Sequence, residues 1–400
     1  MTALRLLKNS GGLQNWVLTR RKNDCILRQV KRLSVTVPRR RPNGVSFLAR
    51  VKRLNMAGTT IRDVAREAGV STATVSYVLN GSRRVGDETR ERVLQTARRL
   101  GYRANFTARN LQASETRLIG YSWRPTPTDQ FNPILDKFLQ SIAEAAARHD
   151  FRILAFPSID VHEELSAYEE MMLIGQVDGF ILTNTNFDDE RVLALVKNHF
   201  PFVSFGRANE DWDFLWIDVD GKAGTLAATR HLIAQGHQRI AFLAWPGKSQ
   251  TGYYRLQGYL DGLAEAGLPA DADWVQLAGN LYDESYMATQ RLLALPPDRR
   301  PSAIVASSDL MAVGVLNAGW DAGLEVGREL AVIGFDDAPI ARYLRPALTS
   351  LAQPIVEIGE QLVTMLIDEI CDRPVQQRHR LMQPSLLVRA SSATSFALSR

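Results

Sequence analysis

Apolar residues near the N-terminal end of the chain recur twice at the three- and four-residue spacing of an amphipathic helix. The first run covers residues 61–68 and ends at Gly69, and the second run covers residues 72–79. Thr60 and Ser71 stand just before the two runs, where a side-chain oxygen can accept hydrogen bonds from unpaired backbone amides. The pattern predicts two short helices joined by a tight turn, which is the helix-turn-helix arrangement that places its second helix in the DNA major groove.

The exposed face of the predicted second helix would carry Thr72, Ala73, Ser76 and Tyr77. Two short amphipathic helices can also serve packing alone, so this pattern by itself leaves DNA binding open. A third helical pattern follows over residues 87–101. Three helices of this length predict a small N-terminal headpiece.

From residue 118 onward, short apolar runs alternate with amphipathic stretches. This alternation is typical of parallel β-sheets flanked by helices, and the length suits two such lobes. Ligands of open parallel sheets bind at the carboxyl ends of the strands, so polar residues directly after strands are candidate ligands. The predicted strands are 118–123, 151–156, 179–182, 202–205, 214–219, 239–245, 303–306 and 331–335.

Charge is distributed unevenly along the chain, although the formal net charge is only +5. Residues 1–55 contain 14 Lys and Arg but one acidic residue, and residues 56–114 contain 10 basic and 5 acidic residues. Residues 115–400 contain 24 basic and 37 acidic residues. We therefore expect a polyanion to bind at the N-terminal end, because phosphates would repel the acidic remainder.

Residues 1–57 mix Arg, Gly and Pro without a sustained period, which predicts a disordered basic extension. Two alternatives stay open: an additional DNA-contacting tail, or a mis-assigned start with Met56 as the initiator. The sequence has no apolar run long enough to span a bilayer and no secretory signal pattern. Because Cys25 and Cys371 are its two cysteines, no disulfide framework is implied, and a cytoplasmic, nucleoid-associated protein is expected.

The string DVAREAGVSTATVSYVLNGSRRVGDETRERVLQTARRLGYRAN resembles the headpiece of the lactose/galactose repressor family of bacterial transcriptional regulators. The resemblance continues almost without gaps to the C-terminus. It implies a helix-turn-helix headpiece over 58–104, a hinge helix over 105–116, and a bilobed α/β core over 117–400 that is similar to periplasmic binding proteins. The two Rossmann-like lobes, each with a parallel sheet, would comprise about 117–219 with 349–378, and about 220–348 with 379–400.

The resemblance also implies a homodimer on pseudo-palindromic operator DNA. The hinge segment is too short to be a stable helix alone, and in the family it pairs with its dimer mate in the minor groove, where a leucine wedges between base pairs. Leu111 matches that leucine, and Ala104 stands where the family usually has proline. The expected DNA-contacting residues are Thr60, Ser71, Thr72, Ala73, Ser76, Tyr77, Asn80, Arg84, Asn105 and Leu111.

A ligand cleft between the lobes follows from the same resemblance. Arg255 and Asp336 match family residues that bind the effector, where an arginine fork and a carboxylate can hold sugar hydroxyls. Ser308 or Asp309 could instead be a helix cap, and Arg207 could instead pair across the lobes. The expected effector-binding residues are Phe131, Asn132, Asn184 (or Asn186), Arg207, Arg255, Ser308, Asp309, Asp336 and Gln353.

This mixture of Asn, Gln, Asp and Arg suits a polyhydroxylated ligand. We therefore expect a sequence-specific repressor of carbohydrate-utilisation genes that is gated by a sugar. A regulator that answers to a purine or another metabolite, or a DNA-binding protein without an effector, are the alternatives. No enzyme, metal or cofactor is expected, because the sequence contains no G-x-S-x-G, H-E-x-x-H or C-x-x-C motif and residues 247–249 lack the upstream glycine of a phosphate-binding loop.

Overall fold

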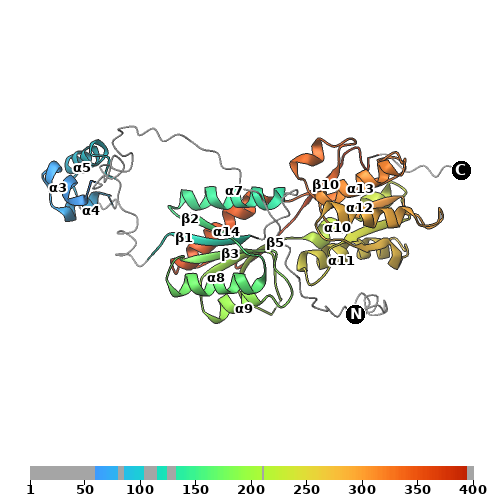
Figure 1. Cartoon of the computed structure of the whole chain (residues 1–400), viewed down its shortest axis with the longest axis horizontal. Coiled ribbons are helices and arrows are strands. Elements are labelled where there is room, and N and C mark those ends of the chain that lie inside the picture. Colours follow the sequence, from blue (N-terminus) through green and yellow to red (C-terminus); the bar gives the residue numbers. More distant parts are fainter. Residues whose placement is uncertain (1–58, 80–84, 103–114, 124–131, 210, 394–400) are drawn as a thin grey trace, which may run out of the picture. The chain divides into compact units, whose positions relative to one another are not determined.

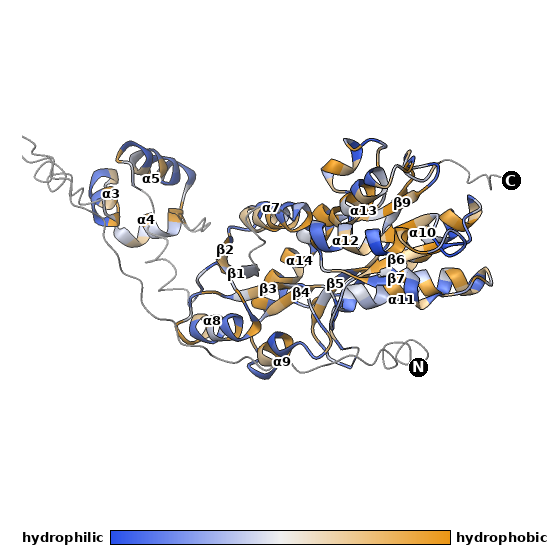
Figure 2. Ribbon diagram, turned by 45° about the vertical axis from the view of Figure 1, so that its right-hand side comes forward, coloured by the Kyte–Doolittle hydropathy of each residue, from blue (hydrophilic) through white to orange (hydrophobic). Residues whose placement is uncertain are grey.

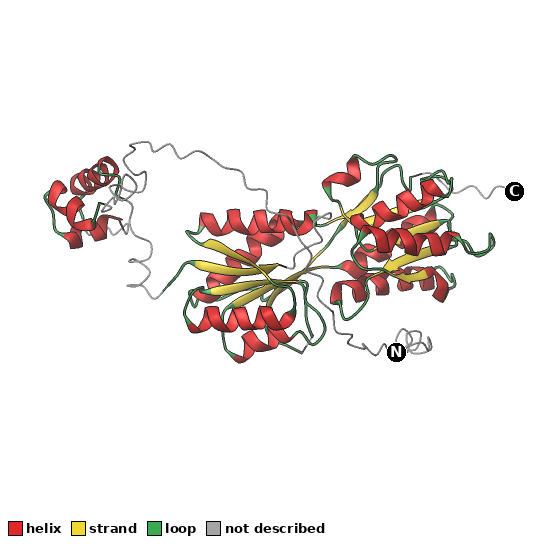
Figure 3. Cartoon of the chain, in the orientation of Figure 1, coloured by secondary structure: helices red, strands yellow, loops and turns green. Residues whose placement is uncertain are grey.

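The computed structural model describes residues 59–79, 85–102, 115–123, 132–209 and 211–393. The chain divides into two compact units, residues 1–113 and residues 114–400. The described part of the first unit is helical, and the second unit contains two β-sheets with helices on both faces (Figures 1 and 3). The predicted extension 1–57 and nearly all of the predicted hinge, residues 105–114, lie outside the described residues.

Helices α3 (Ile61–Ala68), α4 (Thr72–Leu79) and α5 (Asp87–Arg99) form the described part of the first unit and confirm the three predicted helices. The Thr60 hydroxyl accepts the Asp63 backbone N–H at 3.3 Å, and the Asp63 carboxylate accepts the Thr60 backbone N–H at 2.9 Å. Gly69 ends α3 with φ of +63°, a left-handed conformation in which a side chain would be strained. Ser71 caps α4 by accepting the Thr74 N–H at 3.0 Å.

Small apolar side chains hold the three helices of the headpiece together. Val64, Val75 and Val93 are fully buried at the centre, one from each helix. Polar contacts fix the ends of the helices: the Arg92 Nε donates to the Ala68 carbonyl at 3.2 Å, and the Thr59 hydroxyl donates to the Leu100 carbonyl at 2.8 Å. Because α4 buries Val75 and Val78 in this cluster, its opposite face is left exposed.

The first lobe of the second unit is a parallel sheet in the order β11-β5-β4-β3-β1-β2. Helices α7 and α14 pack together against this sheet, and α8 and α9 pack together on its other side (Figure 1). The strands are β1 (Leu118–Trp123), β2 (Arg152–Pro157), β3 (Gly179–Thr183), β4 (Phe202–Phe205), β5 (Leu215–Val219) and β11 (His379–Met382). The helices are α7 (Pro133–Arg148), α8 (Val161–Leu173), α9 (Glu190–Lys197) and α14 (Ile355–Ile370).

The second lobe has the strand order β12-β10-β9-β8-β6-β7, in which only the β10–β12 pair is antiparallel. Helices α10 and α11 pack together beside this sheet, and α12 packs with α13. The strands are β6 (Ile240–Ala244), β7 (Val275–Leu277), β8 (Ala303–Ala306), β9 (Ala331–Asp336), β10 (Thr349–Ala352) and β12 (Ser385–Leu387). The helices are α10 (Gly221–Ala234), α11 (Gln250–Glu265), α12 (Tyr282–Leu293) and α13 (Asp309–Asp321), with 3₁₀ turns η1 (Ala272–Trp274) and η2 (Pro339–Arg342).

The predicted lobe boundaries are wrong at two strands. β10 was expected in the first lobe, but it pairs with β9 and β12 in the sheet of the second lobe. β11 was expected in the second lobe, but it pairs with β5 in the first. Both strands are four residues long, and β11 is a half-exposed edge strand of mixed polarity. β11 lies at a sheet edge and has no fully buried residue, so its sequence pattern does not indicate which sheet it joins. β10 is buried inside its sheet, but a run of four residues is too short to distinguish one sheet from the other.

Close helix packing fixes the position of α11 beside α10. A Cβ atom added to Gly258 would lie 2.1 Å from the Lys222 carbonyl of α10, so only glycine allows the two helices to approach this closely. Strand β6, against which α11 packs, is wholly apolar and buried and is coloured orange in Figure 2. Within the described residues, no helix has both the length and the apolar composition needed to cross a membrane.

Candidate functional site

The outer face of α4 presents the residues that were expected to contact bases. Thr72 and Ala73 at its first turn are exposed, and Tyr77 one turn later has 44% of its surface accessible. Ser76 is half-buried on the neighbouring face. Thr72 and Ala73 at the start of the helix are both small, so the helix N-terminus can approach another molecule closely.

Thr60 and Ser71 of the predicted DNA-contacting set act in this structure as the caps of α3 and α4. Both side chains are also exposed, so capping leaves their accessible surface available to a partner. Four other predicted DNA contacts, Asn80, Arg84, Asn105 and Leu111, lie outside the described residues.

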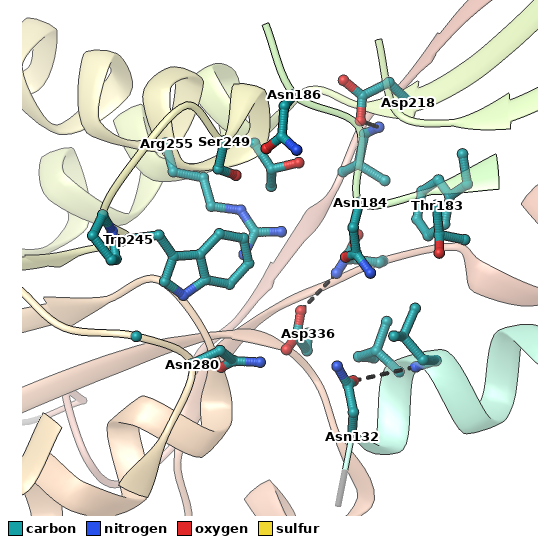
Figure 4. A pocket seen from close by; sticks show the side chains of 18 residues that line it. Asn132, Thr183, Asn184, Asn186, Asp218, Trp245, Ser249, Arg255, Asn280 and Asp336 are labelled. Atoms are coloured by element: carbon teal, nitrogen blue, oxygen red, sulfur yellow. Dashed lines mark hydrogen bonds between the residues drawn. The ribbon is translucent and has the colours of Figure 1, made fainter. Parts of the chain in front are cut away.

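A cavity of about 340 Å³ lies between the two lobes of the second unit, at the carboxyl ends of their strands (Figure 4). Its polar lining comes from both lobes. The lining residues are Asn132, Ile134, Leu135, Thr183, Asn184, Asn186, Phe205, Asp218 and Val219 from the first lobe and Trp245, Pro246, Ser249, Thr251, Arg255, Gly279, Asn280, Asp336 and Gln353 from the second lobe and its crossover.

Arg255, in the second turn of α11, is the central cation of the cavity. Arg255 is 3% exposed, and its guanidinium carbon lies over two aromatic rings, 3.5 Å from the centre of the Phe335 ring and 5.0 Å from the centre of the Trp245 ring. Its Nη1 donates to the Ser307 carbonyl, while its Nε has no hydrogen-bond partner among the described residues. Burial lowers the pKa of Arg255 to about 10, against the opposing charges of nearby carboxylates, so the side chain stays charged at neutral pH.

Asp336, at the end of β9, faces the same space as Arg255. The Gln353 Nε2 donates to its Oδ1 at 2.6 Å, which leaves the Gln353 amide oxygen as an acceptor. Burial raises the pKa of Asp336 to about 6, although the Arg255 charge opposes this shift. The carboxylate and the guanidinium therefore partly compensate each other's charge in the cavity wall.

Asn132 and Asn184 bring amide groups from the first lobe. Asn132 caps α7, with its Oδ1 accepting the Leu135 N–H at 3.3 Å, so that its amide nitrogen is directed to the cavity (Figure 4). Asn184 follows β3 in a left-handed conformation with φ of +54°. Phe131, another candidate of this lobe, lies outside the described residues.

The structure does not place three of the expected effector ligands in the cavity lining. Arg207 instead donates its Nε to Asp218 at 2.8 Å and stacks on the Tyr254 ring of the other lobe at 3.9 Å. Ser308 is the cap of α13, accepting the Met311 N–H at 3.2 Å.

Asp309, the third of these residues, is buried behind the cavity wall. Its carboxylate accepts the Ser350 hydroxyl at 2.6 Å and the Ala338 N–H at 2.7 Å. Burial raises the pKa of Asp309 well above its usual value, and the nearby Asp336 charge adds to this effect. Because these contacts connect helix α13 to β10 and to the turn after β9, Asp309 supports the wall without reaching the ligand space.

One rim of the cavity joins the two lobes. Asn186 forms an isolated antiparallel bridge with Ser249, and the Phe187 N–H donates to the Lys248 carbonyl at 3.1 Å. The Gln250 amide also donates to the Ala208 carbonyl. The rim therefore holds the lobes together beside the lining residues.

A buried ion network supports the first-lobe wall. The Arg191 guanidinium contacts the Glu164 carboxylate at 3.1 Å and the Asp189 carboxylate at 2.8 Å. It also donates to the carbonyls of Thr183 and Asn184, both at 3.1 Å. Arg191 thus holds the backbone of two residues that line the cavity.

Trp245 and Asn280 line the cavity but were missing from the expected set. Trp245 closes the predicted strand 239–245, so the strand-end argument contained a signal for it. Asn280 follows β7, a three-residue strand that the sequence pattern did not reveal, so no comparable signal existed. The Ser308 hydroxyl donates to the Asn280 Oδ1 at 2.5 Å.

Comparison with known proteins assigns both units. Residues 60–105 match the model of the bacterial regulatory proteins of the lacI family, and residues 229–392 match the periplasmic binding protein-like domain. The HTH-type transcriptional repressor CytR of Escherichia coli K12 is 30% identical over 333 residues, which cover 83% of this chain and 96% of that repressor. This chain belongs to the lacI family. The HTH-type transcriptional repressor PurR of Erwinia tasmaniensis is 33% identical, covering 84% of this chain and 97% of its own.

Solved structures of lacI-family regulators share the fold. A regulatory protein of the LacI family from Chloroflexus aggregans is 44% identical with a TM-score of 0.66, over 69% of this chain and 99% of that one. The transcriptional regulator CelR in complex with cellobiose is 29% identical with a TM-score of 0.64, over 83% and 99% of the two chains. The lac repressor dimer bound to operator and the anti-inducer ONPF is 25% identical with a TM-score of 0.72, over 84% and 99%.

In this family, the helical headpiece and the bilobed core belong to one regulatory protein. The chain is a lacI-family DNA-binding transcriptional repressor and not an enzyme. Its second unit has the bilobed fold of periplasmic binding proteins, as the sequence predicted.

Proposed function

We propose that this lacI-family repressor controls carbohydrate-utilisation genes, binds a pseudo-palindromic operator as a homodimer, and responds to a sugar in the cleft between its lobes. The cavity carries this proposal. Its polar groups come from both lobes, with Asn132 and Asn184 on one side and Arg255 and Asp336 on the other. A ligand that contacts both walls binds one arrangement of the lobes better than another, and this differential affinity is what couples a cleft to a distant DNA site.

Two similar proteins support the proposal. One is a regulator solved with cellobiose, and the other is a repressor solved as a dimer on its operator. The amides, carboxylate and guanidinium of the cavity in this chain have the hydrogen-bonding capacity that sugar hydroxyls require.

On the DNA side, we propose that α4 enters the major groove. Thr72 and Ala73 would offer methyl contacts or a single hydroxyl, and the larger Tyr77 would carry more of the base readout. Phosphate contacts would supply much of the affinity and make it depend strongly on salt. Asn105 and Leu111, which would act in the minor groove, remain predictions from sequence.

A ligand panel tests the effector part. The full-length protein is heated with glucose, galactose, cellobiose, glucuronate, nucleosides and purine bases, and the unfolding midpoint is recorded. A ligand present at 100 times its Kd stabilises the folded state by about 2.7 kcal/mol, so a true effector raises the midpoint clearly. We expect a neutral sugar to do so. A shift with purines alone would favour the purine-responsive alternative, and no shift with any compound would favour a repressor without effector.

A hinge variant tests the DNA part. We expect Leu111→Gly to reduce operator affinity toward that for random DNA, because the minor-groove wedge is lost, while ligand binding in the cleft stays unchanged. Leu173→Gly is a matched control, since Leu173 in the second unit is 87% exposed. Fluorescence anisotropy with operator and scrambled duplexes measures both. Operator affinity that is equal in Leu111→Gly and wild type would refute the wedge.

A further inference from the structure

Trp245 presents a flat apolar surface to the cavity. Its indole Nε1–H donates to the Met311 sulfur at 3.0 Å, so the only donor of the side chain is turned away from the ligand space. The ring lies beside the Arg255 guanidinium in the cavity lining (Figure 4). An aromatic face next to charged donors matches a sugar ring, which has apolar faces of C–H groups and a polar edge of hydroxyls.

Two asparagines present amide donors from opposite walls. The Asn280 oxygen accepts the Ser308 hydroxyl, and the Asn132 oxygen accepts the Leu135 N–H. In both side chains the oxygen is engaged by the protein, so the NH₂ group is the end that remains for a ligand. Figure 4 shows the nitrogen of each turned inward among the lining side chains. A ligand that contacts both amides would therefore offer hydrogen-bond acceptors to both lobes.

The charges of the lining are balanced. Among the described lining residues the ionisable groups are Asp218, Arg255 and Asp336. Asp218 is paired with Arg207 at 2.8 Å, and Arg255 faces Asp336. An anionic ligand would have to compete with these two carboxylates for Arg255, and a cationic ligand would meet the guanidinium. The balance favours a neutral ligand.

We infer that Trp245 and Asn280 determine effector specificity for a neutral six-membered sugar ring, with Trp245 packing on the apolar face of the ring and the Asn280 amide donating to a ring or hydroxyl oxygen. Ser308 is a positioning residue, because its hydroxyl fixes which end of the Asn280 amide faces the ligand. The inference rests on the proposed effector function of the cleft. It adds the identity of the residues that determine ligand specificity.

Calorimetric titration of the full-length variants tests the inference, with glucose, cellobiose, glucuronate and hypoxanthine as probes. We expect Trp245→Ala and Asn280→Asp each to weaken binding of the neutral sugar at least tenfold. Trp245→Phe should retain most of the affinity, since it keeps an apolar ring. Asn280→Asp keeps the size of the side chain and the acceptor for Ser308 but removes the NH₂ donors.

Matched controls separate specificity from folding. Trp320→Ala changes a tryptophan that is 39% exposed on α13, and Asn198→Asp changes an exposed asparagine after α9. Both controls should bind the sugar within twofold of wild type. Ser308→Ala should weaken binding and also lower the unfolding midpoint, because a helix cap is lost. Asp160→Ala removes the cap of α8 and should lower the midpoint without changing affinity.

The outcomes distinguish the inference from the function on which it rests. Sugar binding that is equal in wild type, Trp245→Ala and Asn280→Asp would overturn the inference and leave a sugar-gated repressor. Binding of glucuronate or hypoxanthine in preference to the neutral sugars would overturn it and leave a repressor with another effector. If no probe binds while operator binding persists, both the inference and the effector proposal are wrong, and only the DNA-binding repressor remains.

Discussion

Two arginines in the second unit are buried equally, one in each lobe, yet their surroundings are opposite. Arg191 and Arg255 each expose 3% of their surface. Arg191 is bonded to two carboxylates and two carbonyls, whereas Arg255 donates to one carbonyl and otherwise lies between two aromatic rings. Other residues of the protein surround the Arg191 guanidinium with hydrogen-bond acceptors, whereas the Arg255 Nε has no acceptor among the described residues.

The pKa shifts of the two arginines follow this difference. Burial alone would lower the pKa of both. At Arg191 the hydrogen bonds and charge of Asp189, with the charge of Glu164, outweigh burial and raise the pKa. At Arg255 burial dominates and lowers the pKa to about 10. A buried charge with all its partners in place has a structural role, whereas a buried charge with an unpaired donor in a cavity is a candidate for ligand binding.

Arg191→Met should have the largest effect on stability. It leaves the Glu164 and Asp189 carboxylates buried without their cation, which typically costs about 3–5 kcal/mol. Urea unfolding of the full chain, followed by circular dichroism, measures the loss. Arg148→Met is the control, because the Arg148–Glu360 pair is about half exposed and such pairs contribute roughly 0–1 kcal/mol. Equal losses in the two variants would show that the buried network is not structural.

Arg255→Met should have the opposite effect, with a small change in stability and a large loss of sugar affinity. The free energy of unfolding should change much less than in Arg191→Met, since the removed guanidinium is poorly satisfied and the methionine can pack between the rings. Affinity for the sugar should fall by roughly 10- to 150-fold, which corresponds to the 1.5–3 kcal/mol of a charged hydrogen bond. Calorimetric titration and urea unfolding of the same sample provide both values. Wild-type sugar affinity in this variant would remove Arg255 from the site.

Effector binding should weaken below pH 6, and this effect should be smaller than that of Arg255→Met. Burial raises the pKa of Asp336 to about 6, so the carboxylate that accepts ligand hydroxyls becomes protonated below that pH. We expect Kd to be constant above pH 7 and to rise by up to about tenfold per unit below pH 6. Asp336→Asn should bind weakly and without this pH dependence.

Titration of Asp336 does not destabilise the fold at low pH, so unfolding through this group would not account for the predicted rise of Kd below pH 6. The pKa of Asp336 is higher in the folded chain than the ordinary value of 3.8, so the native state binds the proton more tightly. The contribution of this group to stability therefore increases as pH falls from about 6 toward 4, while affinity decreases. A Kd that does not vary between pH 5 and 7 would contradict the role of the carboxylate.

Local patterns in the sequence predicted much of this architecture. Thr60, Ser71 and Gly69 indicated the limits of α3 and α4, because caps and left-handed glycines act within a few residues. The predicted bounds of β1, β4 and β8 agree with the structure, since each strand is an apolar run in a parallel sheet. The pattern missed four short strands, β7, β10, β11 and β12. β7, β11 and β12 lie at sheet edges and have exposed residues, whereas β10 is buried inside its sheet but is only four residues long and half polar.

Buried polar groups were harder to predict. Arg191 lies in the polar stretch DDER, which is typical of a solvated helix start, and its partner Glu164 is 27 residues away. Asn280 depends on Ser308, 28 residues later in the chain. Such long-range pairs leave no periodic signal. Arg255, Asp336 and Gln353 could be placed in the cleft because the family resemblance supplied positions that periodicity alone does not.

Operator binding in the presence of the sugar that most raises the unfolding midpoint tests the central claim most directly. Wild type and Arg255→Met are titrated with the operator duplex, with and without that sugar. We predict equal operator affinity for both proteins without sugar, a clear change in affinity for wild type when sugar is added, and no change for Arg255→Met at the same concentrations. If wild-type affinity does not depend on the sugar, or if Arg255→Met responds as wild type does, the cleft does not control the DNA-binding unit.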